Sequence, residues 1–264
     1  MKPKISVITI CYNAEKEIEK TMVSVLDQSF NDYEYIIVDG ASRDHTMNRI
    51  HKVLDKYPAC NVEVTSEPDR GIYDAMNKGI KKASGEWVIL MNSGDTFLDD
   101  NVLENVFSRK IPEDKTFLYS DAMCILADGK KFLGDCNFEK GQLLHQSIIY
   151  RRALHDEHGY YIVTPKLIIS DYLFFVRIPK EQVMKIDTVI CLFEGGGVSQ
   201  QFRSGEYALC ADYIFHRRTF ANMCFTIIKG RLKDLVPKEI RLKLKSILRV
   251  RHRLMTHPLN LFFM

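Results

Sequence analysis

Residues 87–95, Trp-Val-Ile-Leu-Met-Asn-Ser-Gly-Asp, constrain the fold of this chain more than any other stretch. Five consecutive apolar residues predict a short buried strand, and Asn-Ser-Gly-Asp predicts a sharp turn at its end. In open α/β sheets, ligands bind beyond the carboxyl ends of the strands. Asp95 is therefore either part of a plain turn or a carboxylate presented to a ligand. A hard divalent cation that clamps a diphosphate would use such an oxygen.

Strand and helix patterns alternate over the first hundred residues. Apolar runs predict strands at residues 5–10, 35–38, 62–64 and 87–91. Helical spacing of apolar residues predicts helices at 14–27, 44–57 and 72–83, with Asn13 as the cap of the first. This order predicts an α/β fold with a mostly parallel central sheet flanked by helices.

Polar side chains lie near the ends of three of these strands, namely Thr9, Asp39 and Asp95. The carboxyl ends of parallel strands share one edge of a sheet, so these residues can converge on one ligand. Neither G-x-G-x-x-G nor G-x-x-x-x-G-K-[ST] occurs, so the dinucleotide-binding and P-loop fingerprints are missing. A nucleotide bound here would be held by carboxylates and a metal.

The composition indicates a cytoplasmic globular protein. Seven scattered cysteines without a Cys-x-x-Cys pair favour reduced thiols over a disulfide framework or a zinc site. The chain begins almost directly with a strand pattern rather than a signal peptide, and it has no run of about 18 apolar residues that would predict a transmembrane helix. Within the total charge of +3, residues 203–264 carry thirteen Lys or Arg against four Asp or Glu. This basic tail on an acidic body suggests contact with an anionic surface.

Five fragments, in this order, resemble the inverting family 2 glycosyltransferases of the bacterial polysaccharide type, whose nucleotide-binding half is the GT-A fold. They are residues 6–13, 35–44, 67–79, 85–95 and 170–175. The resemblance implies a GT-A catalytic domain at 1–202, with a nucleotide-binding half at 1–110 and an acceptor half at 111–202, and then the basic helical tail at 203–264.

The implied activity is inverting transfer of a single sugar in cell-surface polysaccharide synthesis. The donor would be a nucleotide-diphosphate sugar, a UDP-sugar in the first instance, and the acceptor a saccharide or a lipid-linked saccharide. By the same resemblance, Thr9, Asp39 and Asp69 contact the nucleotide, and Arg70 lies against the diphosphate. A carboxylate at position 39 suits uracil, because N3–H of that base is a donor.

Asp95 matches the metal-binding residue that closes the family's Asp-x-Asp type of motif, which implies Mn²⁺ or Mg²⁺. The chain departs from the family here, because Asn92 and Gly94 stand where many members carry acidic residues. One carboxylate still suits such ions, which retain waters and use phosphate oxygens as further ligands.

Asp171 matches the family's general base, which takes the proton of the acceptor hydroxyl. From the residues alone, Ser-Asp before an apolar run equally predicts a helix N-cap, and both roles are compatible. His145 and Gln146 match a His-Gln pair that would lie near the acceptor or the diphosphate, although a lone histidine beside apolar residues is often a core residue. Residues 194–199 resemble a loop that closes over the site, and their glycines equally suit a plain connector.

The second half offers two further patterns. Residues 117–126 and 130–134 predict a hairpin joined by an Asp-Gly turn. At 238–255, apolar and basic residues alternate at helical spacing, which fits a helix on the anionic inner face of the cell membrane or a helix packed on the domain. Nucleic acid is not an expected partner, because the tail lacks interleaved aromatic residues.

Two other functions are compatible with parts of the sequence. A non-catalytic sugar-nucleotide-binding or scaffold protein of the same fold is suggested only by the missing acids at positions 92 and 94. A nucleotidyltransferase shares the α/β layout but normally has a Gly-rich loop that begins with a basic residue, which is absent here.

Overall fold

Seven strands form one large sheet in the order β10-β6-β9-β4-β1-β2-β3. The computed structural model describes residues 2–125, 128–164, 168–193 and 204–235. The strands are β1 (Ile5–Cys11), β2 (Tyr33–Asp39), β3 (Val62–Ser66), β4 (Trp87–Leu90), β6 (Phe117–Tyr119), β9 (Ile148–Arg151) and β10 (Val183–Lys185). Among the described strands of this sheet, β9 alone runs antiparallel to its neighbours, β4 and β6. The predicted mostly parallel sheet is confirmed.

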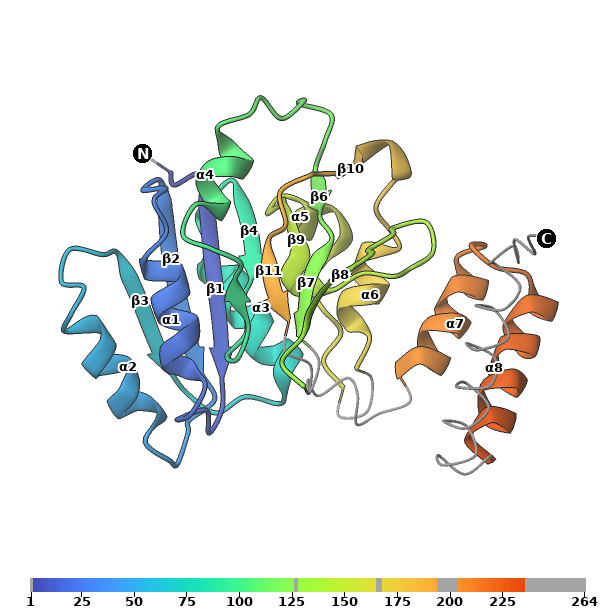
Figure 1. Cartoon of the computed structure of the whole chain (residues 1–264), viewed down its shortest axis with the longest axis horizontal. Coiled ribbons are helices and arrows are strands. Elements are labelled where there is room, and N and C mark those ends of the chain that lie inside the picture. The colour runs from blue at the N-terminus through green and yellow to red at the C-terminus, as the bar shows by residue number, and fades with distance from the viewer. Residues whose placement is uncertain (1, 126–127, 165–167, 194–203, 236–264) are drawn as a thin grey trace, which may run out of the picture.

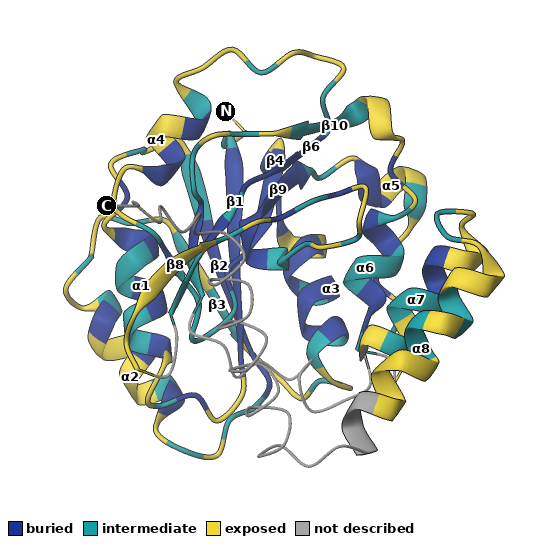
Figure 2. Cartoon of the chain, turned by 45° about the vertical axis from the view of Figure 1, so that its right-hand side comes forward, coloured by how far each residue is buried: buried dark blue, intermediate teal, exposed yellow. Residues whose placement is uncertain are grey.

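Helices cover both faces of this sheet (Figures 1 and 2). On one face lie α1 (Ile18–Leu26) and α2 (Thr46–Leu54), which pack on each other, and on the other lies α3 (Ile72–Lys82), which packs on β1 and β2. A Cβ placed on Gly79 of α3 would lie 2.4 Å from Ile8 Cγ2, so this glycine permits the close approach of helix and sheet. The short helix α4 (Val102–Phe107) follows the turn that contains Asp95.

Asn13 does not cap the first helix. That helix begins at Ile18, and its N-cap residue is Glu17, without a side-chain cap. Asn13 instead adopts a left-handed conformation with φ of 49°, and its side-chain oxygen accepts a hydrogen bond from the Arg43 backbone N–H at 2.9 Å. Asn13 therefore joins the loops that follow β1 and β2, because its short polar side chain tolerates this backbone conformation.

A second sheet of four strands lies beside the first, in the order β5-β11-β7-β8. Its strands are β5 (Thr96–Phe97), β11 (Cys191–Phe193), β7 (Ala122–Ile125) and β8 (Lys131–Gly134). The predicted hairpin is confirmed in β7 and β8, which pair antiparallel. The expected single strand over 117–126 is wrong, because the chain leaves the large sheet at Ser120. The buried Ser120 hydroxyl donates to the Asp121 carbonyl and accepts from the Ile190 N–H, which fixes the break.

A buried aromatic cluster includes residues of α5 (Leu154–His158) and α6 (Ser170–Phe175). His155 stacks on Phe174 with ring centroids 4.4 Å apart. Its Nε2 lies 3.0 Å from the Tyr150 hydroxyl, and its Nδ1 lies 3.1 Å from the Gly159 carbonyl. A neutral imidazole with its proton on Nδ1 satisfies both contacts. Burial lowers the pKa of His155 to about 4, which keeps the ring neutral.

The first part of the predicted tail is a helix pair, α7 (Ser204–Ile214) and α8 (Phe220–Leu235). It contacts the domain through Asp212, which accepts a hydrogen bond from the Tyr172 hydroxyl, and through Arg217, whose guanidinium lies over the Phe138 ring. The helix expected at 238–255 lies outside the described residues. Among the helices that the structure describes, none has the length and apolar character needed to cross a bilayer.

The buried His155 predicts a loss of stability in acid. Unfolding exposes the imidazole, whose ordinary pKa is 6.5, so the unfolded chain binds more protons than the folded one between pH 6.5 and about 4. This group should therefore lower the free energy of unfolding by about 2 kcal/mol between pH 7 and pH 5. Urea denaturation at both pH values should show a smaller pH dependence in His155→Gln.

The exposed His51 on α2 supplies the control for that measurement. His51→Gln should keep the pH dependence of the wild-type protein. Equal pH dependence in the wild type and in His155→Gln would contradict the assignment of acid sensitivity to the buried ring.

Candidate active site

Asp39 is a fully buried carboxylate at the end of β2. Its Oδ1 accepts a hydrogen bond from the Ser42 hydroxyl at 2.5 Å, and its Oδ2 accepts from the Ser66 hydroxyl at 2.6 Å. The Cys11 thiol lies 3.7 Å from Oδ1, and burial raises the pKa of this thiol, so it remains a protonated donor. Hydroxyl and thiol donors can rotate, so Asp39 can exchange one of them for an N–H group of a ligand.

Thr9 lies inside the sheet and has no exposed surface. Its hydroxyl donates to the Met91 carbonyl at 2.7 Å and lies 2.9 Å from the Tyr35 hydroxyl. These contacts tie β1 to both of its neighbours. Thr9 therefore has a structural role within the sheet, and its contact with a nucleotide stays a prediction.

Asp69 and Arg70 lie in the segment that enters α3. Asp69 Oδ1 accepts a hydrogen bond from the Gly71 N–H at 2.8 Å. A Cβ placed on Gly40, directly after β2, would lie 2.4 Å from Asp69 Oδ2, so the glycine lets this carboxylate approach the end of the strand. The Arg70 guanidinium contacts Asp74 at 3.2 Å but remains 79% exposed, so it can meet an anion.

Tyr12 was not among the residues expected from the sequence. It follows β1 directly, 59% of it is exposed, and its ring borders Gly40. An exposed aromatic ring beside two carboxylates offers a surface on which a planar base can stack. The only sequence signal for this role is an aromatic residue placed just beyond a buried strand.

Asp95 lies in the turn after β4, where its backbone carbonyl accepts a hydrogen bond from the Thr21 hydroxyl at 2.8 Å. Gln146 Nε2 donates to Asp95 Oδ1 at 3.1 Å, and His145 Nε2 lies 3.7 Å from Asp95 Oδ2. His145 and Gln146 form the 3₁₀ turn η1 (His145–Ser147) just before β9. Because β9 is the sheet neighbour of β4, the His-Gln pair lies against the predicted metal residue.

Asp171 lies in the first turn of α6 but does not cap it. The N-cap residue is Ile169, and it has no side-chain cap. The Asp171 carboxylate points elsewhere, with Oδ1 accepting a hydrogen bond from the Tyr73 hydroxyl at 2.7 Å and Oδ2 lying 3.9 Å from His145 Nδ1. The alternative of a plain N-cap is therefore wrong.

Tyr73, on α3, is a second residue that the sequence did not single out. It lies within the matched fragment 67–79, but its place on the apolar face of a helix indicated only a core residue. Burial and the nearby Asp171 raise the pKa of the phenol far above its ordinary value, so it keeps its proton and donates.

One imidazole connects the two acidic residues of the site. His145 Nε2 faces Asp95 and also lies 2.9 Å from Asn92 Nδ2, whereas Nδ1 faces Asp171. If the Asn92 amide donates to Nε2, then the neutral ring carries its proton on Nδ1, toward Asp171. The structure thus gathers Asp95, His145, Gln146 and Asp171 at one place. The loop at 194–199 lies outside the described residues.

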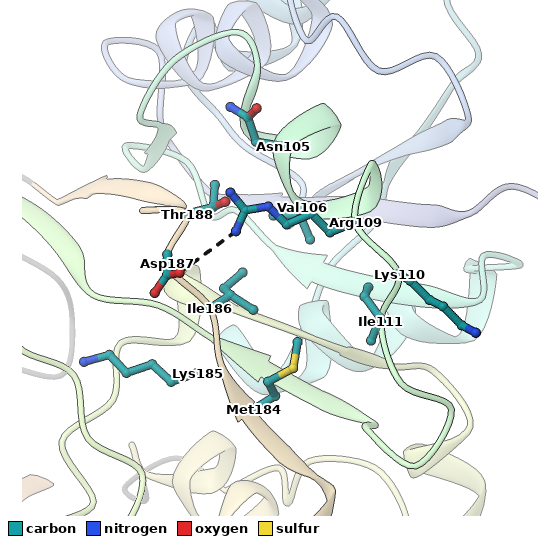
Figure 3. A pocket seen from close by; sticks show the side chains of 10 residues that line it. All are labelled: Asn105, Val106, Arg109, Lys110, Ile111, Met184, Lys185, Ile186, Asp187 and Thr188. Atoms are coloured by element: carbon teal, nitrogen blue, oxygen red, sulfur yellow. Dashed lines mark ion pairs between the residues drawn. The ribbon is translucent and has the colours of Figure 1, made fainter.

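A separate hollow of about 210 Å³ lies between α4 and the segment that continues from β10 (Figure 3). Arg109 extends toward Asp187 across it, at 4.0 Å. Both side chains are largely exposed. None of the lining residues belongs to the carboxylate cluster, that is, to Asp95, His145, Gln146 and Asp171. This hollow is a surface depression with an exposed ion pair and lacks the converging buried polar groups of the cluster.

Comparison with known proteins shows which sequences the chain resembles. Residues 6–128 match the family described as Glycosyl transferase family 2. A PGL/p-HBAD biosynthesis glycosyltransferase of Mycobacterium bovis is 27% identical over 66% of this chain and 69% of its own length. The putative teichuronic acid biosynthesis glycosyltransferase TuaG of Bacillus subtilis is 34% identical over 48% of this chain and 50% of its own length.

Two solved structures share the fold. S. aureus TarS 1-349 in complex with UDP-GlcNAc matches with a TM-score of 0.65 and 22% identity, over 81% of this chain and 65% of that one. The mannosyltransferase PcManGT from Pyrobaculum calidifontis, in complex with GDP-Man and Mn²⁺, matches with a TM-score of 0.65 and 15% identity, over 83% and 65%. The chain thus spans about two thirds of the length of these structures.

The sheet order, the flanking helices and these structural matches define a GT-A fold. The matching family sequence and the similar glycosyltransferases support a relationship to glycosyltransferase family 2.

Proposed function

We propose that this protein is a metal-dependent, inverting glycosyltransferase that moves a single sugar from a UDP-sugar to a saccharide or lipid-linked saccharide in cell-surface polysaccharide synthesis. One observation carries the proposal. Asp95 and Asp171, from distant parts of the chain, face the two nitrogens of one imidazole at 3.7 and 3.9 Å. A metal-binding carboxylate and a base carboxylate thereby border one reaction space. The TarS complex with UDP-GlcNAc and the name of TuaG support the donor and the pathway.

The nucleotide would bind along the edge formed by the ends of β1 and β2. Asp39 would accept the N3–H of uracil after a Ser42 or Ser66 hydroxyl turns away. Asp69 would supply a second polar contact, and Tyr12 a stacking surface. The exposed guanidinium of Arg70 suits the diphosphate, since it forms charge-assisted bonds to phosphate oxygens.

Asp171 would act as the general base. Its carboxylate accepts a bond from the buried Tyr73, which fixes its orientation, and His145 lies on its other side. A carboxylate held in this way can take the proton of the acceptor hydroxyl as the sugar carbon is attacked on the face opposite the leaving diphosphate. Tyr73 is then a positioning residue, because it acts through Asp171.

The donor set near Asp95 fits a divalent cation, Mn²⁺ or Mg²⁺. Asp95 offers a carboxylate whose side chain is 17% exposed, and the neighbouring Gln146 holds a buried amide oxygen that has no partner within the described ranges. Hard cations of this kind prefer carboxylate and amide oxygens, and phosphates and waters fill the other positions. When bound, the cation would neutralise charge on the departing diphosphate.

A non-catalytic sugar-nucleotide-binding protein of the same fold is the alternative, and Asn92 and Gly94 in place of acids favour it. Donor hydrolysis separates the two functions. Release of UDP from UDP-sugars in the presence of Mn²⁺ and the absence of acceptor identifies an enzyme, whereas donor binding without any turnover identifies the binding protein.

The helix pair α7–α8 supports a further part of the proposal, attachment to an anionic membrane surface. Phe225, Ile228 and Leu232 are all more than half exposed and form one stripe along α8. Residues 203–264 carry a net charge of +9. Apolar side chains beside excess Lys and Arg suit the headgroup region of a bilayer with anionic lipids. Such attachment would bring the site close to a lipid-linked acceptor.

Substitution of Asp171 should affect turnover, whereas substitution of Asp95 should affect UDP binding. We expect Asp171→Asn to lower kcat by about 100-fold or more, because the base is lost, while UDP binding stays at the wild-type level. Asp95→Ala should weaken UDP binding in Mn²⁺ but not in EDTA. Titration calorimetry and a UDP-release assay measure both effects. Wild-type turnover in Asp171→Asn would refute the base assignment.

Loss of the Tyr73 hydroxyl should affect turnover and not donor binding. A hydrogen bond to a carboxylate contributes about 1.5–3 kcal/mol, so Tyr73→Phe should lower kcat by roughly 10-fold or more and leave the KM for the donor unchanged. Tyr160→Phe, at an exposed tyrosine, is the matched control. A change confined to KM, or no change in either constant, would contradict the positioning role.

Membrane attachment should depend on the α8 stripe. In flotation with vesicles that contain phosphatidylserine, the double variant Phe225→Asp, Leu232→Asp should stay at the bottom of the gradient, as should the protein without residues 203–264. Leu133→Asp, at an exposed leucine of β8, should float like the wild type. Equal flotation of all variants would remove the membrane proposal.

A further inference from the structure

Gln146 has an unusual position for a polar residue, and its role rests on the function proposed above. Only 2% of it is exposed, and it occupies the middle of the η1 turn beside Asp95. Its amide nitrogen donates to Asp95 Oδ1 at 3.1 Å. Its amide oxygen is buried and has no hydrogen-bond partner among the residues that the structure describes.

Such an oxygen is costly to leave without a partner. A buried acceptor that makes no hydrogen bond costs about 1–3 kcal/mol. Within the described ranges, Asn92 Oδ1 and Ser93 Oγ, in the turn that leads to Asp95, are also buried without a partner. Three neutral oxygens without a partner among the described residues therefore lie in the turn before Asp95 and in the η1 turn that contacts it. This arrangement suits a ligand that accepts electron pairs, such as a cation.

The geometry fits a hard cation. Gln146 Nε2 lies 3.1 Å from Asp95 Oδ1, so the amide that carries the unpartnered Oε1 lies directly beside the carboxylate. Hard cations such as Mg²⁺ and Mn²⁺ bind carboxylate and amide oxygens together, with phosphates and waters in the other positions.

We infer that Gln146 supplies a neutral oxygen ligand to a divalent cation beside Asp95. The cation is then held by one carboxylate and one amide of the protein. This ligand set adds a single negative charge, so the phosphates of the donor must supply the remaining attraction. Metal binding should accordingly be weak without a nucleoside diphosphate and strong with it.

Substitutions at Gln146 test this role by metal binding rather than by turnover. Free Mn²⁺ is counted by electron paramagnetic resonance at saturating UDP. We expect Gln146→Met, which keeps the shape but removes the oxygen, to weaken Mn²⁺ binding at least 10-fold. Gln146→Glu should bind Mn²⁺ more tightly than the wild type. Gln142→Met, at an exposed glutamine just before η1, should bind it like the wild type.

Thermal denaturation supplies a second readout. Gln146→Glu places a carboxylate next to Asp95, so its Tm in EDTA should fall below that of the wild type because of like-charge repulsion. Mn²⁺ with UDP should then raise the Tm of this variant by more than it raises that of the wild type. An equal loss of Tm with and without Mn²⁺ would indicate a packing role only and would overturn the inference.

The controls separate this inference from the proposed function. If the wild type binds no Mn²⁺ with UDP, or if Asp95→Ala binds it equally well, the metal assignment itself fails. If Asp95→Ala loses Mn²⁺ while Gln146→Met keeps wild-type affinity, only the role of Gln146 is overturned. The same holds if Gln146→Met weakens binding of UDP-GlcNAc but not of Mn²⁺ with UDP, because the oxygen would then face the sugar.

Discussion

The imidazole of His145 between two carboxylates is the contact on which the site depends. Asp95 follows β4 in the first half of the chain, and Asp171 opens α6 in the second. His145 lies beside Asp95 because β9, which follows the His-Gln pair, enters the large sheet antiparallel to β4. Asp171 then faces the other nitrogen of the same ring.

Helix α3 makes the second connection between the halves. Its Tyr73 donates to Asp171, and its Asn77 side chain bonds both the N–H and the carbonyl of Tyr161. The segment that enters the same helix carries Asp69 and Arg70. Helix α3 and the segment before it therefore carry both the proposed donor contacts and the hydrogen-bond partner of the proposed base.

In the proposed metal site, amide oxygens would stand beside a single carboxylate. Asn92 and Gln146 bring amide oxygens to the surroundings of Asp95, and amide oxygens are ligands that hard cations accept. Asn92 and Gly94 are the feature that favours the non-catalytic alternative. In the proposed enzyme they are compatible with a site in which the donor phosphates carry more of the negative charge.

The sequence by itself determined the mostly parallel sheet, because apolar runs separated by amphipathic helices allow few other arrangements. It also set Asp39 at the end of one strand and Asp95 in the turn after another, and their convergence on one ligand stays a prediction. It misplaced Asn13, because whether a polar side chain caps a helix or joins two loops depends on neighbouring segments that a local pattern does not reveal. Only the tertiary structure decided that Tyr73 donates a hydrogen bond to Asp171 and that Gln146 donates one to Asp95. Both pairs join residues far apart in the chain, and no local sequence pattern indicates such contacts.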